Sequence, residues 1–214
     1  DLVRSRGLGD VYKRQVLGFP DTTHVTLDHM LHHVEATARG VKNALLVGDM
    51  PIHSYDTVEQ AVQSAKKLFL AGADAVKLEG GAAQAGNIRA IVEAGIPVVG
   101  HIGLLPQKVL EEGGYKIKGK SSAEEEALVR DVEAVAEAGA CAVVVEGVTP
   151  HAARQVTVHS SIPTLGIGSG SHTCDGDVVV IHDLVGAFPW FIPAFVKPRA
   201  DVAGSMTAAV KEWM

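Results

Sequence analysis

The stretch Val76-Lys77-Leu78-Glu79-Gly80-Gly81 places a lysine and a carboxylate two residues apart at the end of an apolar run. In a β-strand, residues i and i+2 share a face, so Lys77 and Glu79 are expected to project together beyond the end of the strand. The two glycines let the backbone turn away. Barrel enzymes present charged groups to a substrate in this way. The alternative is an edge-strand ion pair of little energetic consequence.

The same pattern, a helix-like segment followed by a short apolar run, recurs from residue 26 onward. Helices are expected to begin at Thr26, at the capping box Thr57-Val58-Glu59-Gln60 and at Ser122, and to end near Gly40, Gly72, Gly95 and Gly139. The runs expected to form strands are Ala44–Gly48, Asp74–Glu79, Ile96–His101, Cys141–Glu146, Thr164–Ile167 and Val178–Ile181. Strands that are apolar on both faces and alternate with amphipathic helices are typical of parallel βα units.

We therefore predict one α/β domain over residues 16–214, with the architecture of a (β/α)8 TIM barrel. A closed barrel normally takes ~250 residues, so two strands are unaccounted for and the barrel is expected to be N-terminally incomplete. An open, doubly wound sheet is the alternative architecture.

Composition narrows the classes of function. The chain has 214 residues and a formal net charge of -6, which argues against a nucleic-acid surface, because phosphate backbones are bound by clustered Lys and Arg. Cys141 and Cys174 are the only cysteines, so we expect free thiols in a reducing compartment and a cytoplasmic location. No apolar stretch has the length of a membrane span, and no membrane partner is expected.

Polar residues stand at the predicted C-terminal ends of four successive strands. Asp49 follows Leu45–Val47, His101 follows Val98–Gly100, and Glu146 follows Val143–Val145, in addition to Lys77 and Glu79. A single acidic residue at the end of a strand is commonly a helix cap. Polar residues at the ends of four successive strands are difficult to explain in this way. Asp49 and Glu79 supply the hard oxygen ligands that Mg²⁺ prefers. Together the residues predict a metal site at the mouth of the barrel.

Six sequence motifs, in order along the chain, resemble the ketopantoate hydroxymethyltransferase family, and the resemblance covers roughly residues 16–212. The motifs are Asp49-Met50-Pro51 with Ser54-Tyr55, Val76-Lys77-Leu78-Glu79-Gly80-Gly81, Gly100-His101-Ile102-Gly103-Leu104 with Pro106-Gln107, Gly113-Gly114-Tyr115-Lys116, Gly166-Ile167-Gly168-Ser169-Gly170, and Cys174-Asp175-Gly176 with His182-Asp183.

The resemblance implies a barrel of the phosphoenolpyruvate-utilising type and a metal-dependent hydroxymethyltransferase. The implied reaction moves a hydroxymethyl group from 5,10-methylenetetrahydrofolate to 3-methyl-2-oxobutanoate and gives 2-dehydropantoate, a pantothenate precursor. The implied cofactor is Mg²⁺ or another divalent ion, with the folate as co-substrate, and the implied assembly is a homo-oligomer. Two alternatives stay open: a carbon-carbon lyase of the same superfamily, and an inactive, truncated barrel.

By motif position, the resemblance also implies roles for individual residues. Asp49 and Glu79 match metal ligands, Asp49, Lys77 and His101 match residues that bind substrate, and Glu146 matches the general acid/base. The chemistry is consistent with these types, because a divalent ion acting as a Lewis acid would stabilise an enolate of the 2-oxo acid. Lys77 would neutralise the same developing charge. For Glu146, the alternative is a buried, paired acid.

Residues 1–15 do not fit the pattern of the rest of the chain. They carry Arg4, Arg6, Lys13 and Arg14 and have no apolar period. We expect this segment to be a non-native leader that resembles translated adapter sequence, and a disordered arm is the alternative.

Within this leader, Asp10 takes the place of the family's first metal ligand and is preceded by Gly9, as in the family. The serine that the family has next is Val11 here. Asp10 is therefore a third candidate metal ligand, and we expect the match to be accidental.

Overall fold

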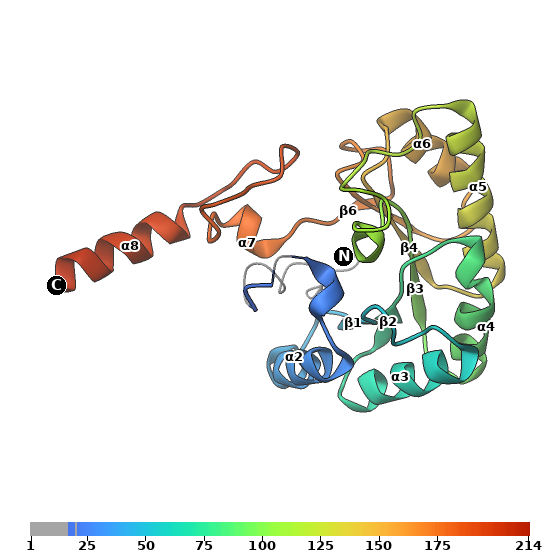
Figure 1. Ribbon diagram of the computed structural model, residues 1–214, viewed down its shortest axis with the longest axis horizontal. Helices are drawn as coiled ribbons and strands as arrows, with labels where there is room; N and C mark the ends of the chain where they lie inside the picture. Colours follow the sequence, from blue (N-terminus) through green and yellow to red (C-terminus); the bar gives the residue numbers. More distant parts are fainter. Residues whose placement is uncertain (1–16, 20) are drawn as a thin grey trace.

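The computed structural model describes residues 17–19 and 21–214, and its centre is a parallel β-sheet (Figure 1). Within the described residues the sheet has six strands in the order β1-β2-β3-β4-β5-β6, so each strand lies beside the next along the chain. The strands are β1 (Val47–Asp49), β2 (Ala75–Lys77), β3 (Val98–Gly103), β4 (Ala142–Glu146), β5 (Thr164–Ile167) and β6 (Gly176–Asp177). An open, doubly wound sheet reverses its strand order part-way. This sheet does not, so the arrangement is that of a (β/α) barrel.

Helices form an arc around the outside of these strands (Figure 1). They are α2 (Leu27–Gly40), α3 (Val58–Leu70), α4 (Ala85–Glu93), α5 (Ser122–Glu137) and α6 (Pro150–His159). The chain also has three short 3-10 turns: η1 (Thr22–His24) before α2, η2 (Ala82–Gln84) after β2 and η3 (Pro106–Lys108) after β3. The chain ends in α7 (Ile181–Leu184) and α8 (Val202–Trp213), and α8 extends away from the strands (Figure 1).

Strands β1 to β5 are mostly buried on both faces, as the apolar runs in the sequence predicted, whereas Asp177 of β6 is exposed. Val76, Val98 and Val143 point outward and pack with helix residues such as Leu68 and Val132. The alternate residues form a second cluster inside the sheet: Val47, Ala75, Val99, Val144 and Ile167.

The positions of the polar residues follow directly from this inner cluster, because side chains alternate along a strand. Asp49, Lys77, His101 and Glu146 each come two residues after a member of the inner cluster, at the C-terminal part of its strand. They therefore continue the inner face toward the mouth of the barrel.

Helix caps agree with the sequence in two places and differ in two others. The Thr26 and Thr57 hydroxyls accept hydrogen bonds from the backbone N–H of His29 and Gln60. Helix α5 is capped by Ser121, one residue before the predicted Ser122, because the Ser121 hydroxyl accepts from the backbone N–H of Glu124.

Gly40 is the last residue of α2 rather than a cap beyond it, and the chain leaves the helix in an extended conformation at Val41. The helix thus ends near Gly40 as expected, but an expectation that Gly40 caps the helix from beyond its last turn is wrong.

The last predicted strand, Val178–Ile181, is also wrong. Strand β6 lies two residues earlier, at Gly176–Asp177, where these residues pair with Leu165 and Gly166. Val178 still donates its N–H to the carbonyl of Gly166. Beyond that point β5 ends, and the positive φ of Gly168 turns the neighbouring chain away, so the apolar run has no strand beside it.

Among the described residues, no helix combines the length and the apolar character that crossing a membrane would need. The sequence predictions about residues 1–15, including Asp10, lie outside the residues that the structure describes.

Candidate active site

The ends of β1 and β2 bring a buried lysine against a buried carboxylate. Asp49 and Lys77 are register partners on these two strands. The Nζ atom of Lys77 lies 2.8 Å from Oδ1 of Asp49, and the side chains are only 1% and 3% exposed. At such a depth the ammonium and the carboxylate each compensate the other's lost hydration.

His101 connects Lys77 to the next strand. Its Nδ1 atom lies 3.3 Å from Nζ of Lys77, and its Nε2 atom lies 3.2 Å from Oε2 of Glu146. An ammonium group only donates hydrogen bonds, so the imidazole accepts at Nδ1 and carries its proton on Nε2. The Nε2 contact is close but is not aligned as a hydrogen bond. Four residues from four successive strands, Asp49, Lys77, His101 and Glu146, thus form one continuous chain of contacts.

Glu79 is held by the segment that follows β3. Its Oε2 atom accepts a hydrogen bond of 2.9 Å from the backbone N–H of Gln107 in η3. The backbone N–H of Gly80 donates to the carbonyl of His101, which fixes the end of the β2 segment beside β3. The Gln107 side chain accepts from the Tyr55 hydroxyl at 2.6 Å and donates to the carbonyl of Met50 at 2.9 Å.

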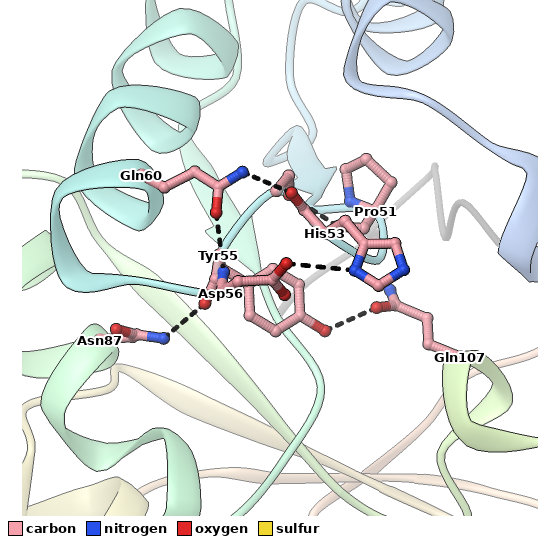
Figure 2. Close-up of polar contacts among 8 residues, drawn as sticks. Pro51, His53, Tyr55, Asp56, Gln60, Asn87 and Gln107 are labelled. Carbon is pink, nitrogen blue, oxygen red and sulfur yellow. Dashed lines mark hydrogen bonds and ion pairs between the residues drawn. The ribbon is translucent and has the colours of Figure 1, made fainter. Parts of the chain in front are cut away.

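The loop after β1 positions Tyr55, as Figure 2 shows. The Gln60 side chain donates to the carbonyl of His53 at 2.5 Å and accepts from the N–H of Asp56 at 3.0 Å. The Asn87 side chain donates to the carbonyl of Tyr55 at 2.7 Å. These bonds from α3 and α4 fix the loop so that the Tyr55 ring points inward to Gln107 (Figure 2).

The surroundings of Tyr55 shift the pKa of its phenol. Burial raises the pKa of the Tyr55 phenol well above its ordinary value, and the negative charges of Glu79 and Asp49 raise it further.

The chemistry of these donors fits a divalent cation. Asp49 and Glu79 are almost fully buried carboxylates at the ends of adjacent segments. The described part of the chain has no group of three or more His, Cys, Asp and Glu residues arranged to hold a metal ion. Mg²⁺ typically uses one or two protein carboxylates and completes its shell with water and substrate oxygens. Two neighbouring carboxylates therefore suit such an ion in number and type.

A cavity of about 630 Å³ opens at the C-terminal ends of the strands. Lys77, His101 and Glu146 line its buried end, and of these three residues Glu146 is the most exposed, at 23% of its side chain. A smaller cavity of about 450 Å³, near the starts of α2 and α3, is lined by none of the predicted site residues. The polar residues and the larger cavity together form the candidate active site.

Of the predicted site residues within the described chain, Lys77, His101 and Glu146 line the cavity. Asp49 and Glu79 are not among its lining residues: Asp49 contacts Lys77, and Glu79 accepts a hydrogen bond from the N–H of Gln107. Asp10 lies outside the described residues. The sequence motifs contained Tyr55 and Gln107 but gave them no role. No periodic pattern identifies them, because Tyr55 lies in a loop and Gln107 in the short turn η3, and their link to Glu79 depends on the folded conformation.

Comparisons with known proteins agree with the motifs. A family model described as ketopantoate hydroxymethyltransferase matches residues 6–214. The 3-methyl-2-oxobutanoate hydroxymethyltransferase of Oleidesulfovibrio alaskensis is 46% identical over 208 residues, which are 96% of this chain and 72% of that protein. The protein of the same name from Cenarchaeum symbiosum is 47% identical over 204 residues, 95% of this chain and 78% of that protein.

Solved structures show the same fold at low identity. 2,3-Dimethylmalate lyase, a member of the PEP mutase/isocitrate lyase superfamily, matches with a TM-score of 0.62 and 19% identity, over 96% of this chain and 71% of that one. Oxaloacetate acetylhydrolase matches with a TM-score of 0.63 and 14% identity, over 95% of this chain and 70% of that one. The fold is thus that of the TIM barrels of this superfamily, and the chain belongs to the ketopantoate hydroxymethyltransferase family of transferase enzymes.

Proposed function

We propose that the protein transfers a hydroxymethyl group from 5,10-methylenetetrahydrofolate to 3-methyl-2-oxobutanoate, giving 2-dehydropantoate. The observation that carries this proposal is the chain of contacts Asp49-Lys77-His101-Glu146 at the buried end of the cavity. It puts a proton acceptor, Glu146, and a fixed positive charge, Lys77, at the wall of one cavity, with the carboxylate of Asp49 in contact with Lys77. Formation of an enolate from a 2-oxo acid uses a base that takes the proton and a positive charge that stabilises the oxygen.

Glu146 is the general acid/base of the proposed reaction. Its carboxylate takes the proton from C3 of the 2-oxo acid, and the electron pair of that bond forms the enolate. Glu146 suits this role because its side chain is partly exposed to the cavity, whereas His101 beside it is fully buried. Its Oε2 atom lies 3.2 Å from Nε2 of His101, which also lines the cavity.

Lys77 stabilises the negative charge that develops on the enolate oxygen. Its ammonium is already fixed by Asp49 at 2.8 Å and by His101 at 3.3 Å, so it needs no reorganisation during the reaction. Asp49 and Glu79 are the residues that would hold a divalent ion such as Mg²⁺, and when bound that ion supplies Lewis-acid polarisation of the keto oxygen.

The carbon-carbon bond then forms between C3 of the enolate and the methylene carbon of the folate. Both bonds from that carbon to the nitrogens of the folate break, and water supplies the hydroxyl oxygen. The proton from C3 and one proton from water go to the two nitrogens. Glu146 is the residue positioned to return the C3 proton.

The test is formation of 2-dehydropantoate by the purified protein with Mg²⁺, with and without 5,10-methylenetetrahydrofolate. We expect product only when the folate is present, and exchange of the C3 proton with deuterated water in its absence. Cleavage of a small 2-hydroxy diacid without folate would instead support a lyase. Binding of Mg²⁺ and the 2-oxo acid without any C3 exchange would support an inactive barrel.

A further inference from the structure

The smaller cavity, of about 450 Å³, shares no lining residue with the candidate active site. It is formed by the start of α2 with the turn before it, by the loop after β1 and by one face of α3. Among the described residues that line it, none is acidic, whereas Lys67 carries a positive charge and His24 and His53 can each take one. A cavity lined by one sign of charge favours a ligand of the opposite sign. This lining therefore favours an anion.

The face of α3 toward this cavity is polar over about two turns. The side chains of this polar stripe that line the cavity are Gln60, Gln63, Ser64 and Lys67. They are neighbours, because residues three and four positions apart share one face of a helix. The Gln60 amide is already used, since it donates to the carbonyl of His53 and accepts from the N–H of Asp56 (Figure 2). Within the described chain, the side chains of the other three make no hydrogen bond or ion pair.

Ser64 contributes a buried hydroxyl to the stripe. The residue is only 5% exposed, and among the described residues its hydroxyl has no hydrogen-bond partner. Other helical hydroxyls of this chain, those of Thr37, Thr157 and Ser205, donate to the carbonyl four residues earlier. The Ser64 hydroxyl does not, and its oxygen is not sealed off by the atoms around it, so it faces the cavity. A buried donor of this kind needs a partner, and the cavity is where that partner would lie.

The rim of the cavity carries His53 in an unusual backbone conformation. Its φ is 63°, in the left-handed region that residues with a side chain seldom adopt. Two carboxylates lie near the rim, and both are engaged. Asp56 lies 3.1 Å from Nδ1 of His53, and Asp21 accepts from the hydroxyl of Thr23 at 2.6 Å. Neither carboxylate lines the cavity, so a ligand there would meet mainly donor groups.

We infer that the smaller cavity binds a small organic phosphate. The three unengaged groups of the stripe are a hydroxyl, an amide and an ammonium, and all of them donate hydrogen bonds. A phosphate group offers three terminal oxygens to such donors, and its charge strengthens each bond. The cavity is larger than a bare phosphate, and Val25, Leu27 and Ile52 also line it. The rest of the ligand is therefore expected to be apolar. No residue of the proposed reaction takes part in this site.

The test measures binding of phenyl phosphate by isothermal titration calorimetry in the absence of Mg²⁺. The unmodified protein should bind it, whereas Ser64→Ala and Lys67→Met should each weaken binding by about tenfold, because each removes a hydrogen bond to a charged group. Unchanged affinity in either variant would overturn the inference, as would no binding by the unmodified protein at millimolar concentrations.

Lys66→Met is the matched control, because Lys66 is exposed on the same helix and does not line the cavity. It should leave phenyl phosphate affinity unchanged, and a loss equal to that of Lys67→Met would overturn the inference in favour of general charge. Thermal unfolding without ligand checks Ser64→Ala. This substitution should not lower the unfolding temperature, because the hydroxyl has no protein partner to lose and alanine is a good helix former. A lowered temperature would give the hydroxyl a structural role instead.

Two further probes test the class of ligand. Inorganic phosphate should bind more weakly than phenyl phosphate, because it lacks an apolar part, and equal affinity would overturn the assignment of an organic ligand. Benzoate should also bind more weakly, because a carboxylate has only two oxygens, and tighter binding would assign the site to carboxylates. An excess of 3-methyl-2-oxobutanoate should leave phenyl phosphate binding unchanged. Competition between the two would place the phosphate in the larger cavity and overturn the inference.

Discussion

The Nζ atom of Lys77 and the Oδ1 atom of Asp49 lie 2.8 Å apart, with both side chains almost completely buried. A buried ion pair is weak evidence for stability, because desolvation offsets much of the attraction. Removing one partner strongly lowers stability, because it leaves the other charge buried and uncompensated. Loss of either residue of this pair is therefore expected to lower both the stability of the fold and the activity.

Lys77→Met should lower the free energy of unfolding by about 3–5 kcal/mol, because Asp49 would lose its buried cationic partner. Guanidinium chloride unfolding at neutral pH measures the change. Arg130→Met is the control, since Arg130 and Glu126 form an exposed pair at 3.8 Å on α5. That substitution should cost less than about 1 kcal/mol. Equal losses in the two variants would contradict a specific role for burial at Lys77.

Glu146→Gln should reduce turnover by about 10²-fold or more while leaving Mg²⁺ and 2-oxo acid binding nearly intact. The amide keeps the size of the side chain but cannot accept the C3 proton. Steady-state kinetics give the rate, and calorimetric titration gives the two affinities. A large loss of Mg²⁺ affinity in this variant would mean that Glu146 has been assigned the wrong role.

Asp49→Asn should behave differently, because it replaces a carboxylate that we propose as a metal ligand. Affinity for Mg²⁺ should fall by at least about tenfold, since even the loss of a partner to a ligand costs that much. Turnover should fall with it. Circular dichroism checks that the variant stays folded despite the loss of the Lys77 ion pair. Unchanged Mg²⁺ affinity would exclude Asp49 from the metal site.

Strands β1 to β5 could be predicted from sequence because they are mostly buried on both faces. A continuous apolar run such as Val143–Val145 can be recognised as a buried strand without knowing which strands lie beside it. The polar residue that ends each run then marks the C-terminal end of the strand. The last strand could not be placed in this way. Its register depends on Gly176 pairing with Leu165, whereas Val178–Ile181 is apolar for another reason: Val178 packs on the inner cluster and Val180 lines the cavity.

The sequence predicted which strand-end residues belong to the site, but not which of them contact one another. Alternation along a strand gives the face of Lys77, but it does not reveal that Nδ1 of His101 is the next contact. Tyr55 lies in a loop and Gln107 in the three-residue turn η3, where no hydrophobic period applies, and their hydrogen bond joins residues that are 52 positions apart. Such links depend on loop conformations that the strands and helices determine only together.

Tyr55→Phe should change the dependence of stability on pH. Burial and the two carboxylates raise the pKa of Tyr55 in the folded protein above the ordinary value of about 10. As the pH rises past about 10, the unfolded chain releases this proton while the folded protein retains it. The contribution of Tyr55 is therefore complete below that pH and is lost above it.

At pH 8 the phenylalanine variant should be less stable by about 0.5–1.5 kcal/mol, because the hydrogen bond to Gln107 is lost. Between pH 9.5 and 11, unfolding curves should show a smaller loss of stability in the variant than in the unmodified protein. Parallel losses in the two proteins would mean that the Tyr55 pKa is not raised by folding.

The final prediction concerns Asp10, whose place in the sequence matches the family's first metal ligand. We expect Asp10→Ala to leave Mg²⁺ affinity unchanged, because Lys13 and Arg14 follow closely in the sequence and positive charges near the carboxylate disfavour a bound cation. Glu79→Gln is the positive control and should weaken Mg²⁺ binding by at least about tenfold. Calorimetric titration with Mg²⁺ measures both variants.

A companion variant replaces residues 1–15 with a Val-Gly-Asp-Ser-Leu-Gly lead-in before Val16. If the present segment is a non-native leader, this replacement should raise both Mg²⁺ affinity and the free energy of unfolding, because it restores a carboxylate without nearby cations. No gain in either quantity, or a loss of Mg²⁺ binding in Asp10→Ala, would show that residues 1–15 are a working part of the site. In that case Asp10 would join Asp49 and Glu79 as a ligand.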